Sequence, residues 1–289
     1  MSTIVFDLDT PNLAKTYDEI SDSQFERGQA LINLLGVTST STVLDIGSGT
    51  GRLGRWLLAD RLSEGVYIGI DPLPERVKIA NEKNAHGNAT YKIARAEDLG
   101  FIKDNTIDIV YLSAVYHWIA DKPKALKEVH RVLKVGGKVG LNTGAKELTE
   151  KQTTRRVLKR ILSTEKYAGR IDPDKVFQFN GVTATQLVEQ FSEAGLTLSK
   201  LEIVRNDRIQ PNGAFILDHL ESSTFGNYLN NVPEDLRGEV RKDFVEGLDA
   251  IATPQGIKVT GFSIVAIAEK GGQCRGRSST GNAERKSVN

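Results

Sequence analysis

The feature that most constrains this chain is the alternation of short β-branched segments with longer segments of helical periodicity. The strands expected in its first half are rich in Val, Ile and Leu, and they are residues 42–46, 66–70, 91–94, 107–112 and 138–142. Helices are expected between them, among others at residues 52–59, at 74–83 and from Asp121 to the Gly136-Gly137 pair. Because a helix after each strand returns the chain to the same edge of a sheet, this order predicts a parallel sheet covered on both faces.

The second half of the chain is less regular, and it determines the expected division of the molecule. We expect one α/β domain over residues 1–270, with a Rossmann-like, doubly wound, mostly parallel sheet of seven strands that ends with strands at 196–204 and 258–269. The expected parts are N-terminal helices at 11–36, a core at 37–144, 182–205 and 257–270, helical cap insertions at 145–181 and 211–256, and a disordered tail at 271–289. A basic helix is expected at 146–167.

Charge and cysteine usage exclude several functions. With 38 Lys and Arg against 37 Asp and Glu, the formal net charge is +1, so no overall basic field draws the chain to nucleic acid or to an anionic membrane. The one cysteine, Cys274, lies in the expected tail, which excludes a core thiolate, a multi-cysteine metal site and an internal disulfide. The sequence has no apolar run long enough to span a membrane. We therefore expect a cytoplasmic monomer or homodimer that acts on a small molecule and holds no metal.

The strongest chemical signal is an apolar strand that runs directly into the glycines Gly47, Gly49 and Gly51. Alternating glycines let the backbone turn tightly and approach a ligand closely. Since Gly49, Gly51 and Gly54 also satisfy the spacing of dinucleotide-binding enzymes, the glycines alone leave a nicotinamide-dependent oxidoreductase open. The carboxylate of Asp45, two residues before the first glycine, would repel a pyrophosphate and instead favours a ligand with a cationic amine.

A second acidic residue, Asp71, ends the next expected strand, 20 positions after Gly51. A carboxylate at this place can accept hydrogen bonds from both hydroxyls of a ribose. Pro72 and Pro74 follow it, and they leave open that Asp71 is a turn or helix-capping residue. The two acidic strand ends together predict a nucleoside-like ligand without a pyrophosphate.

With these motifs in order, the chain resembles the class I S-adenosylmethionine-dependent methyltransferases, specifically the type 11 group with its quinone C-methylating and trans-aconitate-type enzymes. The resemblance implies S-adenosylmethionine as cofactor and S-adenosylhomocysteine as product. The residues that it implies for cofactor binding are Asp45, Gly47, Ser48, Gly49, Gly51, Asp71, Pro72, Ala96, Glu97 and Ser113. At the position where the family usually has an adenine-contacting acid, this chain has Arg95, so the backbone of Ala96 or the side chain of Glu97 is expected to take that contact.

The acceptor is expected beside the loops that leave the fourth and fifth strands, because ligands of doubly wound sheets lie over the carboxyl ends of the strands. The first of these loops contains His117 and Trp118. His117 is the candidate acid, base or acceptor-orienting group, and the alternative is a packed loop histidine. Tyr17 is a further candidate for the reaction site, since the resemblance places its segment over the cofactor, and the alternative is a core tyrosine.

The expected reaction is methyl transfer to an oxygen or carbon of a small organic molecule. Carbon-5 methylation of pyrimidines needs a cysteine nucleophile, which the core lacks. Base-amine methylation uses an Asn/Asp-Pro-Pro-aromatic turn in related enzymes, whereas residues 113–116 are Ser-Ala-Val-Tyr. Besides the oxidoreductase, a catalytically silent S-adenosylmethionine-binding module remains an alternative.

Overall fold

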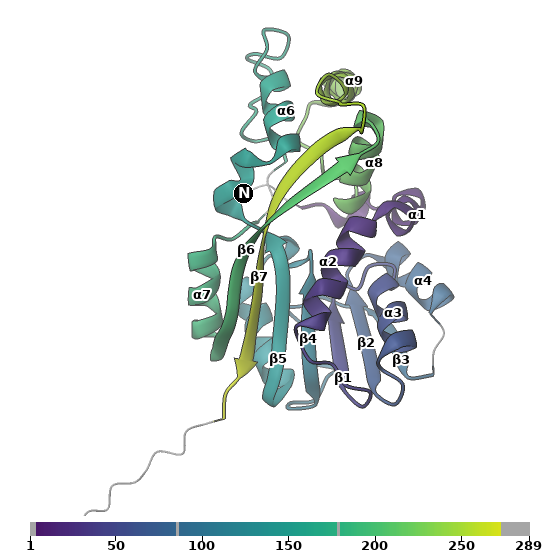
Figure 1. The fold of residues 1–289 in the computed structure, drawn as a ribbon, viewed down its shortest axis with the longest axis vertical. Coiled ribbons are helices and arrows are strands. Elements are labelled where there is room, and N and C mark those ends of the chain that lie inside the picture. The colour runs from purple at the N-terminus through teal and green to yellow at the C-terminus, as the bar shows by residue number, and fades with distance from the viewer. Residues whose placement is uncertain (1–3, 85–86, 178–179, 273–289) are drawn as a thin grey trace, which may run out of the picture.

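A seven-stranded sheet forms the centre of the molecule, in a computed structural model that describes residues 4–84, 87–177 and 180–272. Its strand order is β3-β2-β1-β4-β5-β7-β6, and only β7 runs antiparallel to its neighbours (Figure 1). The strands are β1 (Thr42–Ile46), β2 (Val66–Asp71), β3 (Ala89–Ile93), β4 (Ile107–Ser113), β5 (Leu133–Gly144), β6 (Leu196–Gln210) and β7 (Ile257–Lys270). The predicted Rossmann-like, mostly parallel sheet is confirmed.

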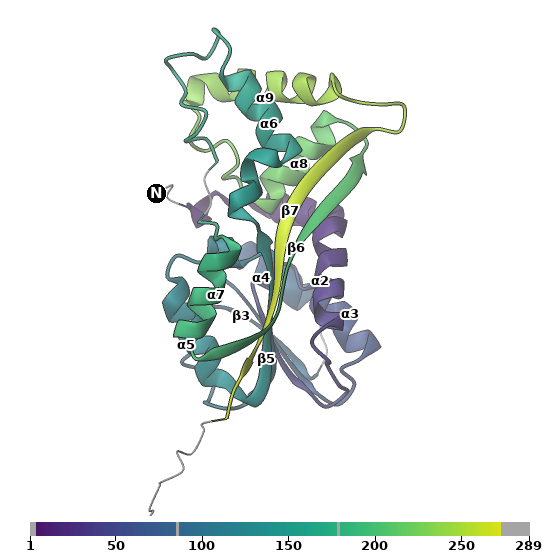
Figure 2. The same cartoon turned by 60° about the vertical axis from the view of Figure 1, so that its left-hand side comes forward.

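Helices cover both faces of this sheet, as Figure 2 shows in a view close to its edge. One face packs against α2 (Asp22–Asn33), α3 (Arg52–Asp60) and α4 (Pro74–Lys83) through one cluster of buried apolar side chains. The other face packs against α5 (Lys122–Val132) and α7 (Ala184–Glu193) through a second cluster. The strands therefore have apolar side chains on both faces, which is why they are rich in β-branched residues.

Local capping chemistry sets the helix starts close to their predicted positions. The carboxylate of Asp121 accepts a hydrogen bond from the backbone of Lys124 at 3.0 Å and begins α5. At the start of α7, Thr183 and Gln186 form the reciprocal capping box that their spacing predicts. These side chains satisfy amide groups that a helix cannot pair internally, so they fix where each helix begins.

The upper part of the molecule is built from the segments between the core strands. Its helices are α1 (Pro11–Ile20), α6 (Thr153–Leu162), α8 (Gly213–Ser223) and α9 (Glu234–Asp249), and its 3-10 turns are η1 (Phe6–Leu8) and η3 (Lys146–Lys151). A third 3-10 turn, η2 (Tyr116–Trp118), follows β4. A separate apolar cluster holds α6, α8 and α9 together above the sheet (Figure 1).

Three predicted elements differ from the structure. The helix expected to run to Gly136-Gly137 ends at Val132, and both glycines lie within β5. The helix expected at 146–167 is divided, because Gln152 has an extended backbone (ψ 137°) between η3 and α6. The strand expected at 196–204 continues to Gln210, since β6 and β7 stay paired as a two-stranded ribbon that rises beyond the sheet. Cross-strand contacts of Asp207 with Thr260 and Lys258 stabilise this ribbon, and such pairs cannot be seen in the sequence of one strand.

The predicted disordered tail lies almost wholly outside the described residues, as does Cys274. In the described ranges 4–84, 87–177 and 180–272, no helix has the length and apolar character that crossing a bilayer would require.

Phe244 tests whether the upper cluster is part of the cooperative fold. Its side chain is fully buried, and its ring lies 5.7 Å from that of Tyr228. We expect Phe244→Ala to lower the free energy of unfolding by about 3–5 kcal/mol, because it removes a buried ring and leaves a cavity. Val188→Ala, at a site 39% exposed on α7, is the control in the same urea titration. A loss below about 1 kcal/mol for Phe244→Ala would show that the cluster unfolds separately.

Candidate functional site

The glycine loop between β1 and α3 adopts backbone angles that other residues rarely adopt. Gly47, Gly49 and Gly51 have φ of +77°, +54° and +78°. A Cβ on Gly47 would lie 2.1 Å from the side chain of Val115, and one on Gly51 would lie 2.4 Å from the side chain of Asn84. The loop therefore needs glycine both for its turn and for its close approach to the neighbouring segments.

Asp71, at the end of β2, binds this loop directly. One carboxylate oxygen accepts a hydrogen bond from the amide of Gly49 and the other from the amide of Leu73, each at 2.9 Å. The side chain is buried, and burial raises the pKa of Asp71 from its ordinary value while nearby Arg76 opposes the rise. Since each carboxylate oxygen has a second lone pair, Asp71 can still accept hydrogen bonds from a ligand.

A cleft opens over the carboxyl ends of β1, β2 and β4, and it encloses about 720 Å³, including part of its open mouth. This size is typical of sites for small molecules, which range from about 300 to 1,000 Å³. The predicted site residues that line it are Tyr17, Gly47, Gly49, Asp71, Pro72, Ala96, Glu97, Ser113 and Trp118. Nine residues that the sequence analysis singled out from six separate segments thus lie around one space.

The roof of the cleft contains residues that the sequence analysis missed. Phe6 stacks on Phe225 with ring centroids 5.5 Å apart, and the rings of Phe225 and Trp118 meet edge to face with centroids 4.8 Å apart. The guanidinium of Arg95 lies 4.5 Å over the ring of Phe6 at the same wall. Because Phe6 and Phe225 are more than 200 positions apart, no spacing rule could have paired them.

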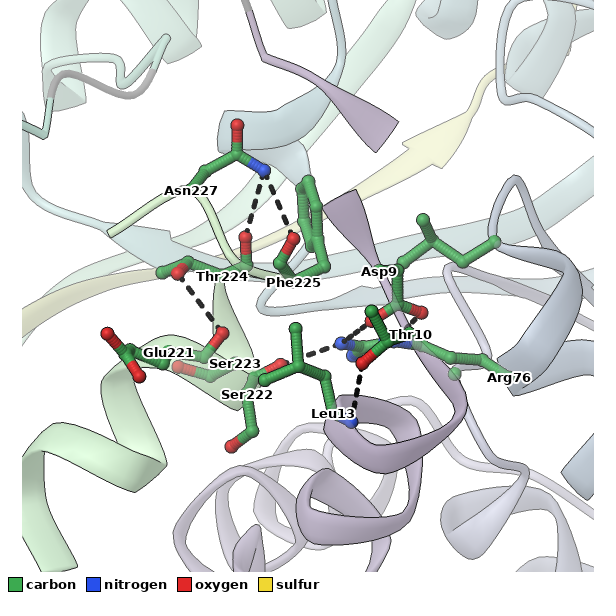
Figure 3. A network of polar contacts seen from close by, with 12 residues as sticks. Asp9, Thr10, Leu13, Arg76, Glu221, Ser222, Ser223, Thr224, Phe225 and Asn227 are labelled. Carbon is green, nitrogen blue, oxygen red and sulfur yellow. Dashed lines mark hydrogen bonds and ion pairs between the residues drawn. The ribbon is translucent and has the colours of Figure 1, made fainter. Parts of the chain in front are cut away.

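Arg76 on α4 ties this roof to the sheet domain, as Figure 3 shows. Its guanidinium forms two hydrogen bonds with the carboxylate of Asp9, both at 3.1 Å, and donates a third to the carbonyl oxygen of Ser222 at 2.6 Å. The same guanidinium lies 4.5 Å over the ring of Tyr17. The side chains of Arg76 and Asp9 are 5% and 3% exposed, so this is a buried ion pair between two segments far apart in the sequence.

Asp45 does not line the cleft, which corrects the expectation that its carboxylate faces a cationic ligand. Its side chain is 2% exposed, and one oxygen accepts hydrogen bonds from the hydroxyls of Tyr67 and Tyr111 at 2.6 and 2.8 Å. Burial raises the pKa of Asp45 to about 7. The residue supports the glycine loop from below, because the pleat of β1 turns its side chain toward the face of the sheet that α2 and α3 cover.

Glu97 lies at the cleft but already has partners. Its Oε1 accepts the backbone amides of Ala120 and Asp121 at 3.2 and 3.3 Å, which anchors the start of α5. Ala96 beside it is buried and lines the same wall.

A smaller polar cavity of about 350 Å³ continues from the cleft and shares Tyr17, Gly47 and Ser113 with it. The predicted residue Ser48 lines this cavity together with Thr50. Among the described residues, the buried hydroxyl of Ser48 has no hydrogen-bond partner, whereas that of Thr50 lies near the carboxylate of Asp18. Unpaired buried hydroxyls are costly, so they mark a place where a polar ligand group or water fits.

His117 lies on the other side of η2, in a cavity lined also by Ala114, Asn142 and Thr143. Its Nδ1 is 3.0 Å from the hydroxyl of Thr143. Burial, with a smaller effect of Lys122 and Arg27, lowers the pKa of His117 to about 3. The imidazole is therefore uncharged near neutral pH and too weakly basic for an efficient general base, which narrows its predicted role to orienting an acceptor.

Ala114 joins the two spaces, since it lines both the cleft and the His117 cavity. It has a left-handed backbone (φ +58°), and its amide donates to the side-chain oxygen of Asn142 at 2.8 Å. Strained backbone of this kind persists only where neighbours hold it, and it is common at functional sites. The strand end of β4 thus carries residues of two adjoining cavities.

Asp45 gives a test of the support beneath the glycine loop. Asp45→Ala leaves two buried tyrosine hydroxyls unpaired, so we expect it to lower the free energy of unfolding at pH 7 by about 2–5 kcal/mol. Asp45→Asn keeps an oxygen acceptor, and we expect a loss below about 1 kcal/mol. Equal losses for the two variants, measured by urea unfolding, would contradict this role.

The same residue predicts a pH dependence. The pKa of Asp45 rises from 3.8 to about 7 on folding, so the folded state keeps a proton that the unfolded state has lost between these values. Its contribution to stability therefore falls as pH rises from about 4 to about 7, by up to about 1.4 kcal/mol per pH unit. We expect Asp45→Asn to lack this fall, and Asp98→Asn, at an exposed site, to retain it.

Comparison with known proteins agrees with this geometry. A family model described as a methyltransferase domain matches residues 44–141. The malonyl-(acyl-carrier protein) O-methyltransferase of Marinomonas sp. is 32% identical over 132 residues, which cover 45% of this chain and 48% of that protein. The ubiquinone/menaquinone biosynthesis C-methyltransferase UbiE of Hydrogenovibrio crunogenus is 37% identical over 119 residues, 37% of this chain and 44% of that protein. The matched region thus spans less than half the length of either relative.

Solved structures share the fold. The YcgJ protein of Bacillus subtilis matches with a TM-score of 0.57 and 20% identity, covering 85% of this chain and 98% of that one. The geranyl diphosphate C-methyltransferase of Streptomyces coelicolor, solved with S-adenosyl-L-homocysteine, matches with a TM-score of 0.50 and 14% identity, covering 85% and 77%. Residues 44–141 therefore match a methyltransferase domain, and the chain shares the fold of these solved structures.

Proposed function

We propose that this protein transfers a methyl group from S-adenosylmethionine to an oxygen or carbon of a small organic molecule and releases S-adenosylhomocysteine. The observation that carries the proposal is the juxtaposition of two spaces at the end of β4. The glycine loop and Asp71 line one space, and His117 lines the other. A transferase needs such a pair, because donor and acceptor must meet at one point.

The residues of the cleft fit the cofactor part by part. Asp71 offers carboxylate lone pairs for the two ribose hydroxyls, and the aromatic wall with Phe6 and Trp118 offers flat apolar surfaces for the adenine. The unpaired hydroxyl of Ser48 would receive the amino-acid end. When bound, S-adenosylmethionine supplies an electrophilic methyl group on a sulfonium.

The chain's own part in the reaction is positioning. The neutral imidazole of His117 can accept or donate a hydrogen bond to an acceptor, and Thr143 fixes its ring through Nδ1. Trp118 and Ile119 contribute apolar surface to the wall of the cleft. Two observations support an oxygen or carbon atom as the methyl acceptor. Residues 113–116, after β4, lack the turn that related enzymes use for base amines, and the names of the two relatives describe an O- and a C-methyltransferase.

Calorimetry with the purified chain tests this proposal. We expect S-adenosylmethionine and S-adenosylhomocysteine to bind with one site per chain, and NAD to show no binding at the same concentrations. Saturable binding of NAD without binding of S-adenosylhomocysteine would contradict the proposal and favour a nicotinamide-dependent oxidoreductase.

Asp71 is the residue whose loss affects the cofactor most. We expect Asp71→Ala to weaken S-adenosylhomocysteine binding by about 10–100-fold, since it removes charge-assisted hydrogen bonds worth about 1.5–3 kcal/mol. Asp98→Asn, at an exposed site on the same side of the sheet, is the matched control. An affinity of Asp71→Ala within twofold of the parent, with an unchanged circular dichroism spectrum, would refute the ribose assignment.

His117 is expected to act on the acceptor alone. Once an acceptor is found, His117→Ala should raise its KM by about 3–10-fold, change kcat less than about threefold and leave S-adenosylhomocysteine affinity unchanged. His130→Ala is the control, since His130 lies in the last turn of α5 and lines neither the cleft nor the His117 cavity. A general base typically contributes about 10²–10⁴-fold to the rate. A fall of kcat by about 10²-fold or more would therefore show that His117 transfers a proton.

A further inference from the structure

A second space adjoins the His117 cavity and shares Arg27, Gln152, Asn206 and Gly261 with it. The two spaces enclose about 650 and 530 Å³, including part of their open mouths. They lie between α2, the ribbon of β6 and β7, and α8. The residues proposed to bind the cofactor line neither of these two spaces, so a ligand in them would be a molecule other than the cofactor.

Arg27 on α2 lines both spaces. Within the described ranges, its guanidinium has no hydrogen bond and no ion pair, and the side-chain amide of Asn142 donates to its backbone carbonyl at 3.4 Å. Burial, with a smaller effect of Arg208, lowers the pKa of Arg27 to about 10. Arg27 is only partly exposed and faces two open spaces. A guanidinium that loses part of its hydration without a carboxylate partner is destabilising, so it is available to bind an anionic group.

Arg208 on β6 adds a second positive charge to the same space. It donates one hydrogen bond to the carbonyl oxygen of Ser23 at 3.0 Å and forms no ion pair with any described residue. The acid that attracts both arginines, Glu26, lies on the exposed side of α2 and lines neither space. The two guanidinium groups therefore repel each other across a cavity that no described carboxylate lines.

The remaining polar walls are neutral hydrogen-bonding groups. No described lining residue of either space is acidic. Burial, then Arg27 and Arg208, lowers the pKa of His219 to about 4, and its Nε2 lies 2.9 Å from the side-chain oxygen of Gln24. The side-chain amide of Asn206 donates to the hydroxyl of Ser263 at 3.0 Å. The cavity thus combines a net positive charge with polar neutral side chains.

We propose that these two spaces form an oxyanion site, in which Arg27 and Arg208 bind a carboxylate or phosphate group of the methyl acceptor. The planar, forked donors of guanidinium match both oxyanions. Ala114 links this site to the cofactor cleft, so an acceptor anchored at Arg27 extends past His117 toward the transferred methyl group. The inference rests on the proposed function and deepens it, because it specifies a negatively charged acceptor.

Anion binding to the protein saturated with S-adenosylhomocysteine tests the site. The probes are succinate, inorganic phosphate and pyrophosphate, with neutral succinamide and chloride at matched ionic strength as controls. We expect at least one oxyanion to bind to the parent, and Arg27→Gln and Arg208→Gln to weaken that binding about 10–100-fold. Arg170→Gln, whose side chain is 54% exposed, is the matched control and should bind like the parent. Preference for succinate or for the phosphates identifies the oxyanion.

Thermal unfolding without anion separates this role from a structural one. If Arg27 is an unpaired charge kept for a ligand, Arg27→Met should unfold at the same or a higher temperature than the parent. A lower unfolding temperature for Arg27→Met, or oxyanion affinities equal in parent and Arg27→Gln, would overturn the inference. S-adenosylhomocysteine affinity is measured in parallel: its absence in the parent contradicts the proposed function, whereas its retention with no Arg27-dependent anion binding contradicts only the oxyanion site.

Discussion

The hydrogen bond between the carboxylate of Asp71 and the amide of Gly49 holds together the two strand ends on which the cleft is built. β1 and β2 are parallel neighbours, so the loops that leave them meet at one edge of the sheet. The amides of Gly47 and Ser48 also donate to the carbonyl oxygen of Ile70, at 2.7 and 2.9 Å. A loop of left-handed glycines is thereby fixed by its neighbour, with Asp45 and two tyrosines supporting it from below.

The roof depends on a different interaction, the buried pair of Arg76 and Asp9. A buried ion pair is tolerated when further hydrogen bonds and contacts satisfy both charges. Here the carbonyl oxygen of Ser222 and the ring of Tyr17 complete the surroundings of the guanidinium. Because Tyr17 also lines the cleft, the contact that closes the roof is part of the wall that a ligand meets.

The two adjoining cavities differ in charge, and this difference gives the proposed reaction a physical order. The cleft is lined by Asp71 and Glu97 and also by Arg76 and Arg95, of which Arg76 is paired with Asp9. The space beyond His117 is lined by Arg27 and Arg208 and by no described acid. A sulfonium cofactor is positively charged, and the proposed acceptor is negatively charged. In a protein interior, where charges are weakly screened, each would be favoured on its own side. Uncharged His117 lies between them and leaves this separation intact.

The sequence by itself determined that the chain forms a mostly parallel sheet. It also determined where the first five strands and the glycine loop lie along the chain, because periodicity and capping are local properties. Asp71 and Trp118 could be named because strand ends of a doubly wound sheet meet at one edge, whereas Tyr17 was named from the family resemblance. Only the tertiary structure decided that Asp45 is buried beneath the loop and that His117 is a very weak base, because both follow from desolvation by distant segments. It alone brought Phe6 beside Phe225, and it extended β6 to carry Arg208 opposite Arg27, since pairing across a ribbon depends on the partner strand and not on the sequence of either one.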